Sequence, residues 1–553
     1  MSALSGVGVG RGIAAAKVLR MPEPLAPPSD EPLAAPADAE HQRVQVALQE
    51  VAADLGARAE AAGGDAQEVL EAAALMAQDP AILDDVRTRL DGGVNAEKAT
   101  WDAYASFREM LTAMGGYMAE RATDLDDVAQ RVVARLRGVA APGVPASDEP
   151  FILVARDLAP ADTATLDLEK TLALVTQDGG PTSHTAILAR SKSLPAVVGV
   201  VGILDAVVDG QLVIVDAKAG TVVLDPDDAS VTAAQGEREA RLAAASAPIT
   251  DGALADGTKV PLLANVGSPK DAPAAIELGA EGVGLFRTEF LFLGASSAPT
   301  VEQQTAAYTE LLQGFSGKKV IARVLDAGAD KPLSFLNDAH EENPALGLRG
   351  IRALRATEQI LRDQLTALAN AQAATGAELH VMAPMIADHE ETAYFVALGK
   401  ELGLASVGAM AEVPSIAVLA DQVFEAADFV SIGTNDLTQY TMAADRQLGS
   451  VAAFQDPWHP AVLRLIKLIG DAGAAAGKPV GVCGEAAADP GLAVVLVGLG
   501  ATSLSMSASA LADVRAELLT VTLDEAKARA ERALTAKSAA EARELAAAGS
   551  LIE

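Results

Sequence analysis

Eight short apolar runs alternate with helical patterns in the second half of this 553-residue chain. Runs of this kind, each followed by a segment with helical spacing of its apolar residues, indicate strands joined by crossover helices. The runs begin at Lys259, Gly282, Lys319, Leu346, His380, Ser406, Phe429 and Pro479. Repeated strand–helix units of this type close into a (β/α)8 barrel. We therefore predict a TIM-like barrel over residues 251–553.

The first half of the chain combines two other patterns. Short strand-like runs occupy residues 1–20 and return after residue 150, which predicts an α/β domain. Between them, apolar residues recur at helical spacing and the pattern breaks at Gly or Pro, which predicts a helical bundle. We predict an α/β multidomain protein made of an α/β domain (1–20 and 145–226), an inserted helical bundle (21–144), a linker helix (227–250) and the C-terminal barrel (251–553).

Composition excludes several classes of protein. The formal net charge of −33 argues against a nucleic-acid partner, which requires clustered Lys and Arg. The single cysteine, Cys483, cannot form an intrachain disulfide and fits a reducing compartment. The N-terminus lacks the pattern of a signal peptide. The longest uncharged stretch, residues 491–512, is broken by Gly and Ser and indicates a buried helix, turn and loop. We expect a cytoplasmic protein without membrane insertion.

A histidine-bearing motif, GGPTSHTAILAR, begins at Gly179 in the predicted α/β domain. The two glycines permit a sharp turn, and Ser183 is a suitable N-cap for the helix that follows. His184 would lie in its first turn, where the helix dipole favours a neutral imidazole and an incoming anion. Such an imidazole can attack phosphorus, and Arg190 could bind phosphate oxygens. By itself the motif is better explained as a capping loop with a partly buried histidine. A catalytic role for His184 therefore depends on what the barrel residues indicate.

Charged and polar residues gather at the ends of the predicted barrel strands, the face on which barrel active sites are built. They are Arg287 (second strand), Arg323 and Asp326 (third), Arg349 (within the fourth), Glu412 (sixth), Asn435 and Asp436 (seventh), Cys483 and Glu485 (eighth), and Arg446 in the loop after the seventh. Four arginines at one rim suit a ligand that carries both a carboxylate and a phosphate. Glu412 and Asp436 offer oxygen ligands for Mg²⁺, which would bridge the same phosphate.

Six motifs carry a resemblance to a known family. They are GGPTSHTAILAR, GLFRTEFLFL, RVLDAGADKPL, NPALGLRGIR, SIGTNDLTQYTMAADR and GVCGEAA. Together they closely resemble enzyme I of the bacterial sugar phosphotransferase system, a phosphoenolpyruvate–protein phosphotransferase. The resemblance covers the whole chain, including the helical insertion and the order of the domains. It implies a Mg²⁺-dependent enzyme that phosphorylates its own histidine, passes the phosphoryl group to the phosphocarrier protein HPr and releases pyruvate, as the first step of sugar uptake.

The resemblance also assigns roles to individual residues. His184 would be phosphorylated by phosphoenolpyruvate, and Cys483 would protonate the enolpyruvate leaving group at carbon. A free cysteine is more often a small structural hydrophobe, but a place at a strand end beside Glu485 favours the acid role. The remaining assignments are Mg²⁺ ligands (Glu412, Asp436), substrate-binding residues (Arg287, Arg323, Asn435, Asp436, Arg446, with Arg349 also expected to line the site) and a hydrogen-bond partner of the active histidine (Thr163).

Pro181 occupies a position where many enzyme I sequences carry arginine. The resemblance therefore does not predict the geometry of the histidine loop. A proline there also resembles pyruvate phosphate dikinase and phosphoenolpyruvate synthase, which share the barrel. Those relatives need a large ATP-binding domain, for which the sequence before His184 has neither the length nor the pattern. The helical insertion takes that place and, in the family, docks HPr. A non-catalytic phosphoenolpyruvate sensor is the other alternative, disfavoured because His184 and Cys483 are both present. Dimerisation through the barrel is expected from the family.

Overall fold

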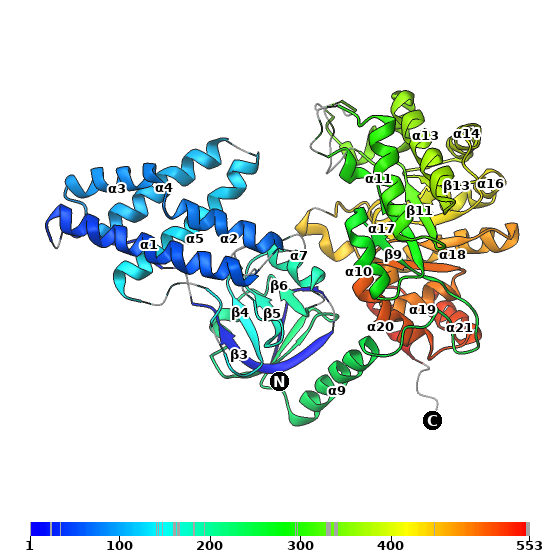
Figure 1. Cartoon of the computed structure of the whole chain (residues 1–553). Helices are drawn as coiled ribbons and strands as arrows, with labels where there is room; N and C mark the ends of the chain where they lie inside the picture. Colours follow the sequence, from blue (N-terminus) through cyan, green and yellow to red (C-terminus); the bar gives the residue numbers. More distant parts are fainter. Residues whose placement is uncertain are drawn as a thin grey trace. The chain divides into compact units, whose positions relative to one another are not determined.

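The computed structural model describes residues 2–548 except 11, 23–24, 34, 63, 115, 140, 142, 146, 159–161, 163–165, 181–182, 193, 294, 296, 328–332, 334, 337–340 and 447. The chain divides into two compact units, Met1–Leu242 and Ala243–Glu553 (Figure 1). Each unit contains its own clusters of buried apolar side chains.

An eight-stranded mixed sheet forms the α/β part of the first unit. Its strands are β1 (Ser2–Ser5), β2 (Val7–Val9), β3 (Ile13–Arg20), β4 (Phe151–Ala155), β5 (Thr171–Thr176), β6 (Ala196–Val198), β7 (Leu212–Asp216) and β8 (Thr221–Leu224). The order is β1-β8-β7-β3-β4-β5-β6-β2. Strands β3 to β6 are parallel, and the outer pairings are antiparallel.

The central strands are buried on both faces, as their nearly continuous apolar sequence predicts. Along β4, Ile152 and Val154 face one core, which includes the short helix α8 (Ile203–Ala206). Phe151 and Leu153 face the other core, where helix α7 (His184–Ser191) packs through small alanines. The sheet thus places the start of α7 beyond the carboxyl end of β5, where ligands often bind in α/β folds.

Five helices lie between β3 and β4, as the periodicity predicts. They are α1 (Ala37–Ala62), α2 (Gly64–Met76), α3 (Pro80–Asp91), α4 (Ala96–Met114) and α5 (Gly116–Arg137). Val44, Leu48 and Leu55 of α1 are buried in their common core. The pattern breaks at Pro80, and Asp79 before it is the N-cap of α3, because its side chain accepts a hydrogen bond from the Ala81 amide at 2.8 Å. Helix α9 (Asp228–Ala245) follows the sheet.

A closed, parallel eight-stranded barrel forms the second unit. Its strands are β9 (Leu262–Val266), β10 (Gly282–Arg287), β11 (Lys319–Arg323), β12 (Glu378–Ala383), β13 (Ser406–Ala411), β14 (Val430–Ile432), β15 (Val480–Val482) and β16 (Ser503–Met506). The α-helices that connect and follow them are α10 (Ala272–Glu277), α11 (Val301–Gly314), α12 (Ile351–Ala356), α13 (Glu358–Thr375), α14 (His389–Glu401), α15 (Pro414–Val418), α16 (Ala420–Ala426), α17 (Thr434–Met442), α18 (Pro460–Ala476), α19 (Pro490–Gly498), α20 (Leu511–Leu518), α21 (Leu523–Leu534) and α22 (Ala539–Ala547).

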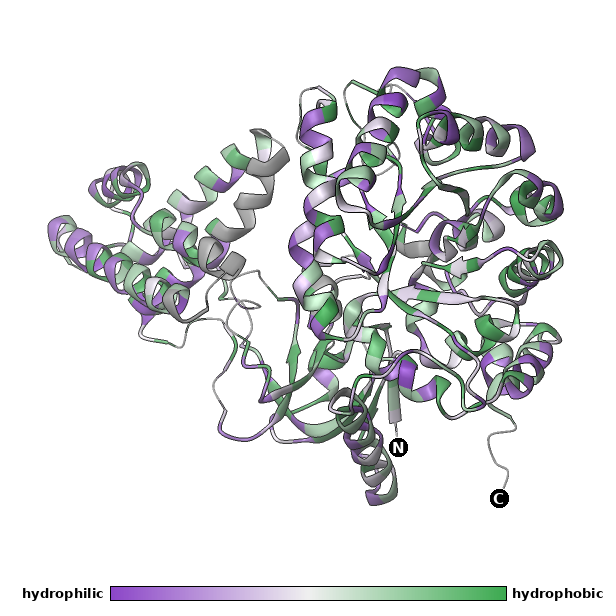
Figure 2. Ribbon diagram, turned by 45° about the vertical axis from the view of Figure 1, so that its right-hand side comes forward, coloured by the Kyte–Doolittle hydropathy of each residue, from purple (hydrophilic) through white to green (hydrophobic). Residues whose placement is uncertain are grey.

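Short 3-10 turns complete the barrel loops. They are η1 (Pro269–Asp271), η2 (Glu289–Leu291), η3 (Pro344–Leu346), η4 (Gly449–Phe454), η5 (Glu485–Ala488) and η6 (Ala508–Ala510). Figure 2 shows hydrophobic residues along the barrel strands and hydrophilic residues on the helices around them. Within the described part of the chain, no helix has both the length and the apolar character that crossing a membrane requires.

The predicted barrel is confirmed, but one of its predicted strands is wrong. Residues 346–352 form the end of η3, a loop and the start of α12, because Gly350 has a φ of +57° and the side chains of Leu346 and Leu348 are exposed rather than buried. The eighth strand is β16, inside the uncharged stretch that was expected to hold only helix, turn and loop. Consequently Arg349 lies in the loop after the third strand, β11. The later site residues each follow a strand that is one place earlier in the barrel than predicted. Those expected after the sixth, seventh and eighth strands follow β13, β14 and β15, which are the fifth, sixth and seventh.

Candidate active site

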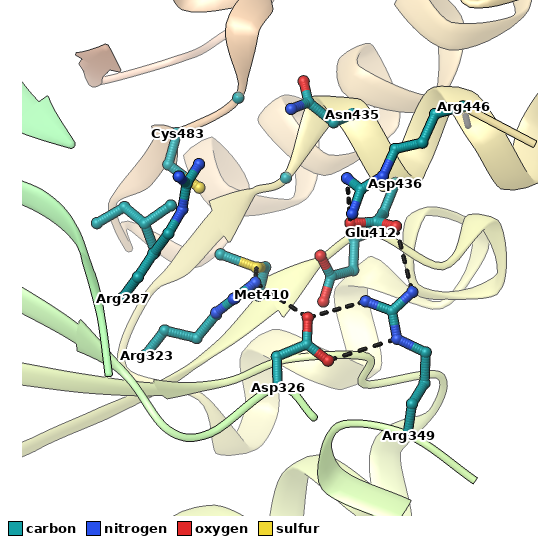
Figure 3. A pocket seen from close by; sticks show the side chains of 13 residues that line it. Arg287, Arg323, Asp326, Arg349, Met410, Glu412, Asn435, Asp436, Arg446 and Cys483 are labelled. Atoms are coloured by element: carbon teal, nitrogen blue, oxygen red, sulfur yellow. Dashed lines mark hydrogen bonds and ion pairs between the residues drawn. The ribbon is translucent and has the colours of Figure 1, made fainter. Parts of the chain in front are cut away.

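A cavity of about 190 Å³ opens at the carboxyl ends of the barrel strands. Nine residues that the sequence singled out line it together: Arg287, Arg323, Asp326, Arg349, Glu412, Asn435, Asp436, Arg446 and Cys483. Figure 3 shows their side chains converging on one space from different strands. Leu285, Met410, Gly433 and Gly484 complete the lining.

The ends of the strands explain why these side chains meet. Arg287 and Arg323 are the last residues of β10 and β11, and Glu412 and Cys483 directly follow β13 and β15. Asn435 and Asp436 lie in the first turn of α17, after β14. Gly484 permits the close approach of these last two segments, because a Cβ at this position would lie 1.8 Å from the Thr434 hydroxyl.

Asp326 ties two of the arginines together. Its Oδ2 lies 3.1 Å from Nη1 of Arg323 and 2.8 Å from Nη2 of Arg349. Burial works in the opposite direction, but the two guanidinium groups hold the pKa of Asp326 below its usual value. Asp326 therefore remains ionised and orients both arginines toward the cavity.

A second carboxylate, Asp436, joins Arg349 to Arg446. Its two oxygens lie 3.4 Å from Nη1 of each of these arginines. Arg349 also donates to the hydroxyl of Tyr440 at 3.0 Å, and that hydroxyl donates to the carbonyl of Ala345. Tyr440 of α17 thereby holds the loop that contains Arg349 in place.

Glu412 is a buried carboxyl group on which the nearby carboxylates act more strongly than the nearby arginines. Its Oε1 accepts a hydrogen bond from the Met385 amide at 2.6 Å. Figure 3 shows the carboxyl group of Glu412 between those of Asp326 and Asp436. Burial, together with Asp436 and Asp326, raises the pKa of Glu412 to about 8. A Cβ at Gly433 would lie 3.0 Å from Oε2, so glycine keeps room beside that oxygen.

The donor set at Glu412 and Asp436 fits a divalent cation. Two carboxylates are the protein ligands that Mg²⁺ often takes, since phosphate oxygens and water supply the rest. A cation beside Glu412 would also provide the positive charge that the buried group lacks.

Cys483 presents a buried thiol to the same cavity. Its side chain packs with Leu285 and Met410, and Sγ lies 3.5 Å from the carbonyl oxygen of Ile432. Burial raises the pKa of this thiol to about 11, although a hydrogen bond with Ser431 opposes the rise. Cys483 is thus protonated at neutral pH. The neighbouring Glu485 side chain does not line the cavity.

The histidine motif belongs to the first unit. His184 begins α7, and the hydroxyl of Ser183 accepts a hydrogen bond from the Ala186 amide at 3.3 Å, which confirms the predicted N-cap. Gly179 has a φ of +92°, a conformation that favours glycine. Thr185 donates to Asp157 at 3.2 Å and anchors the first turn to the loop after β4.

Other predicted residues around the histidine have no described side-chain contacts. Thr163 and Pro181 lie outside the described residues, and Arg190 is described only as part of α7. Asp162, which precedes Thr163, is buried and paired with Arg131 of α5 at 3.1 Å. This ion pair joins the loop before β5 to the inserted helices.

Sequence reasoning missed some residues of the site. Leu285 and Met410 line the cavity but look like ordinary strand residues, and Tyr440 falls within a helical pattern. Asp326 was noted at a strand end without a role. Only its contacts with two arginines reveal its importance.

Known proteins match this chain along its length. Models of PEP-utilising enzymes match as the N-terminal part at residues 5–121, the mobile domain at 147–220 and the PEP-binding domain at 243–523. The phosphoenolpyruvate-protein phosphotransferase of Streptomyces coelicolor is 53% identical over 546 residues, which cover 98% of each chain. The protein of the same name from Bacillus subtilis is 39% identical over 557 residues, 97% of each chain.

Both units are therefore shared with these relatives in the same order. The barrel carrying the cavity coincides with the matched PEP-binding domain, and the histidine motif lies within the matched mobile domain. The chain belongs to the family of phosphoenolpyruvate-protein phosphotransferases.

Proposed function

We propose that the barrel cavity binds phosphoenolpyruvate, that His184 takes its phosphoryl group and passes it to HPr, and that pyruvate is released. The observation that carries this proposal is the convergence of four arginines, two acidic oxygen donors and a protonated thiol in one cavity. Phosphoenolpyruvate needs this combination, because it carries a phosphate, a carboxylate and a carbon that must be protonated.

The arginines bind and orient the substrate. Guanidinium groups form paired hydrogen bonds with carboxylate and phosphate oxygens alike. Arg323 and Arg349 are fixed by Asp326, so little conformational entropy is lost when substrate arrives. Their positive charge stabilises the phosphoryl oxygens during in-line transfer. Asn435 would add an amide hydrogen bond from α17.

Glu412 and Asp436 would hold Mg²⁺ beside the phosphate. When bound, the cation offsets negative charge on the phosphoryl oxygens. Asp436 also contacts Arg349 and Arg446, so the same carboxylate would link the metal position to the arginines.

Cys483 would provide the proton. After the P–O bond breaks, the enolate needs a proton at its terminal carbon to become pyruvate. The thiol packs against Leu285 and Met410, which offer an apolar surface for the methylene group. The S–H bond breaks, the new C–H bond forms, and the thiolate remains near Arg287 and Arg323 until solvent reprotonates it.

His184 would be the acceptor of the phosphoryl group. At the first position of α7 the helix dipole disfavours an imidazolium and favours an anion. Its neutral nitrogen attacks phosphorus, while Thr163 and Arg190 would support the ring and the phosphate. The helical insertion, residues 21–144, would present HPr to the same histidine.

The wider assignments extend the same proposal. We place the phosphohistidine domain at 1–20 and 145–226, the linker helix at 227–250 and the phosphoenolpyruvate-binding and dimerisation domain at 251–553. The segments that follow the carboxyl ends of the barrel strands carry exposed apolar side chains, which a second copy could cover: Leu346, Leu348, Val418, Leu448 and Phe454. A cytoplasmic location accords with the single cysteine, and the phosphoryl group would serve sugar uptake.

Incubation with radiolabelled phosphoenolpyruvate, Mg²⁺ and HPr tests the proposal. We expect acid-labile phosphate on the chain that moves to HPr, and a His184→Ala variant that binds phosphoenolpyruvate without becoming labelled. Binding without any transfer by the unmodified chain would instead indicate a sensor. A requirement for ATP would indicate a dikinase or synthase.

A further inference from the structure

Glu289 is a buried carboxylate next to the cavity that the proposed chemistry does not use. It begins η2, two residues after Arg287, and its relative exposure is 3%. It does not line the cavity. An ionised group in this position has a high desolvation cost unless it is paired, so its contacts should reveal why it is there.

One oxygen of Glu289 makes two contacts with the neighbouring strand. Oε1 accepts hydrogen bonds from Nη2 of Arg323 at 2.7 Å and from the backbone amide of Asp326 at 3.1 Å. Glu289 thus binds the side chain of one cavity residue and the main chain of another. Its second oxygen is buried and has no hydrogen-bond partner among the described residues.

The guanidinium of Arg323 is held from two sides. Glu289 contacts Nη2, while Asp326 contacts Nη1 at 3.1 Å. Because Asp326 also contacts Arg349, the position of the Asp326 backbone influences a second cavity arginine. Glu289 is therefore connected to two arginines without contacting the cavity.

The segment after β11 is fixed one amide at a time. The Val324 amide donates to the carbonyl of Met382 at 3.0 Å, and the Leu325 amide donates to the side chain of Gln364 at 2.9 Å. The next amide is that of Asp326, and Glu289 is its acceptor. Without Glu289, the last of the three anchors would be lost directly beside the cavity.

Electrostatics gives Glu289 a second role. Burial and the nearby Arg323 both lower the pKa of Arg287, whereas Glu289 counteracts them. Glu289 likewise supports the charged form of Arg323. The carboxylate offsets repulsion between two arginines that must remain close while the cavity is empty.

We infer that Glu289 is a positioning residue that holds Arg323, and through Asp326 also Arg349, in the orientation that binds the phosphoryl group. This inference rests on the proposed role of Arg323 in substrate binding. Glu289 itself would touch neither the substrate nor the metal.

The test compares Glu289→Ala and Glu289→Gln with the unmodified full-length protein, using pyruvate formation at varied phosphoenolpyruvate concentrations with Mg²⁺ and HPr. Truncating one partner of a buried ion pair is expected to lower kcat/KM by at least about 30-fold in Glu289→Ala. Glutamine retains an oxygen acceptor but no charge, so Glu289→Gln should lose less, about fivefold.

Glu281 supplies the matched control at the opposite end of β10. Its Oε1 accepts from the amides of Gly252 and Leu262 at 2.7 and 2.8 Å. Glu281→Gln should lower the melting temperature but keep kcat/KM within about twofold, because it affects only structural contacts. If both Glu289 variants keep kcat/KM within the same range, the inference is wrong. If the alanine variant fails to fold, the kcat/KM of Glu289→Gln alone tests the inference.

A double-mutant cycle with Arg323→Ala separates the inference from the proposed function. Because Glu289 acts through both Arg323 and the Asp326 amide, Glu289→Ala should lower kcat/KM by a smaller factor in the Arg323→Ala background than in the unmodified protein. Fully additive losses would overturn the inference. If Arg323→Ala itself leaves kcat/KM unchanged, the proposed role of Arg323 fails, and the inference fails with it. A loss in Arg323→Ala but not in the Glu289 variants leaves the proposed function intact and refutes only the inference.

Discussion

The chemical role that we propose for Cys483 depends on the surroundings of this buried residue. Its thiol is 2% exposed, adjoins Leu285 and Met410, and lies close to the arginine-lined part of the cavity. Burial keeps the pKa of the thiol near 11, so the proton is retained throughout the neutral range. The developing carbanion of an enolate is a strong enough base to remove it.

Replacing Cys483 with alanine should separate protonation from binding. General acid catalysis contributes on the order of 100-fold or more, so pyruvate formation should fall by at least about that factor. Phosphoenolpyruvate binding, measured by calorimetry in the His184→Ala background, should change by less than about threefold, because the arginines remain. Cys483→Ser keeps the size of the side chain without its acidity and should behave similarly. Unchanged turnover in either variant would exclude the acid role.

The arginines and the cysteine at the strand ends were predictable because parallel strands end at one face, so Arg287, Arg323 and Cys483 had to meet. Glu289 was not predictable in the same way. A glutamate that follows a strand and begins a short helix equally fits an exposed N-terminal turn. Only its contact with Arg323, which depends on the alignment of β10 with β11, shows that the Glu289 carboxylate packs against the strand ends rather than facing solvent.

At the level of elements, β16 shows where hydrophobic patterning fails. Its sequence, SLSM, has hydroxyl residues where a buried strand usually has apolar ones. Closure of the barrel explains Ser505, since its hydroxyl donates to the side chain of Asn265 on β9 at 2.6 Å. That partner is 240 residues away, so local sequence carries no sign of it.

Helix α7 should depend on its N-cap. The Ser183 hydroxyl accepts from the Ala186 amide, and loss of such a cap costs about 1 kcal/mol. In Ser183→Ala, we expect amide exchange in the first turn of α7 to become about fivefold faster, as measured by hydrogen–deuterium exchange. Ser538→Ala, which removes the N-cap of α22, is the matched control and should affect only α22. Equal exchange rates in α7 with and without Ser183 would contradict the capping role.

Strand β12 should contribute to loss of stability in acid through His380. Burial, followed by the charge of Lys319, lowers the pKa of His380 below 6.5, although Glu378 opposes this. Asp428, a third nearby charge, favours the protonated form as well. The unfolded chain therefore binds the proton more readily, and stability falls as the pH drops below about 6.5.

His380→Gln should reduce that acid sensitivity. The difference in melting temperature between about pH 7.5 and pH 5.5 should be smaller in this variant, measured by calorimetry at constant ionic strength. His389→Gln provides the comparison, because this histidine lies at the start of α14 and contacts the carbonyl of Gln422. The same pH dependence in all three proteins would show that His380 does not contribute.

At the scale of the whole molecule, the proposed reaction is divided between two compact units. His184 belongs to residues 1–242, whereas the cavity that we propose for the substrate belongs to residues 243–553. Direct transfer requires the imidazole to approach phosphorus to about 3–3.5 Å. HPr needs access to the same nitrogen, so both partners cannot occupy it at once. The proposed function therefore predicts that the α/β domain alternates between them.

We predict that this alternation uses residues 141–150, part of which lie outside the described residues, and the segment 227–247 that includes α9. Phosphoenolpyruvate with Mg²⁺ should shift the interdomain distances seen by small-angle scattering, because a filled cavity favours the arrangement that brings His184 to the substrate. His184→Ala should still show the shift, since it retains the cavity. Arg323→Ala should show little, because binding is weakened. A distance distribution that stays the same at saturating substrate would mean that the domains do not move, and transfer would then need His184 to lie permanently at the cavity.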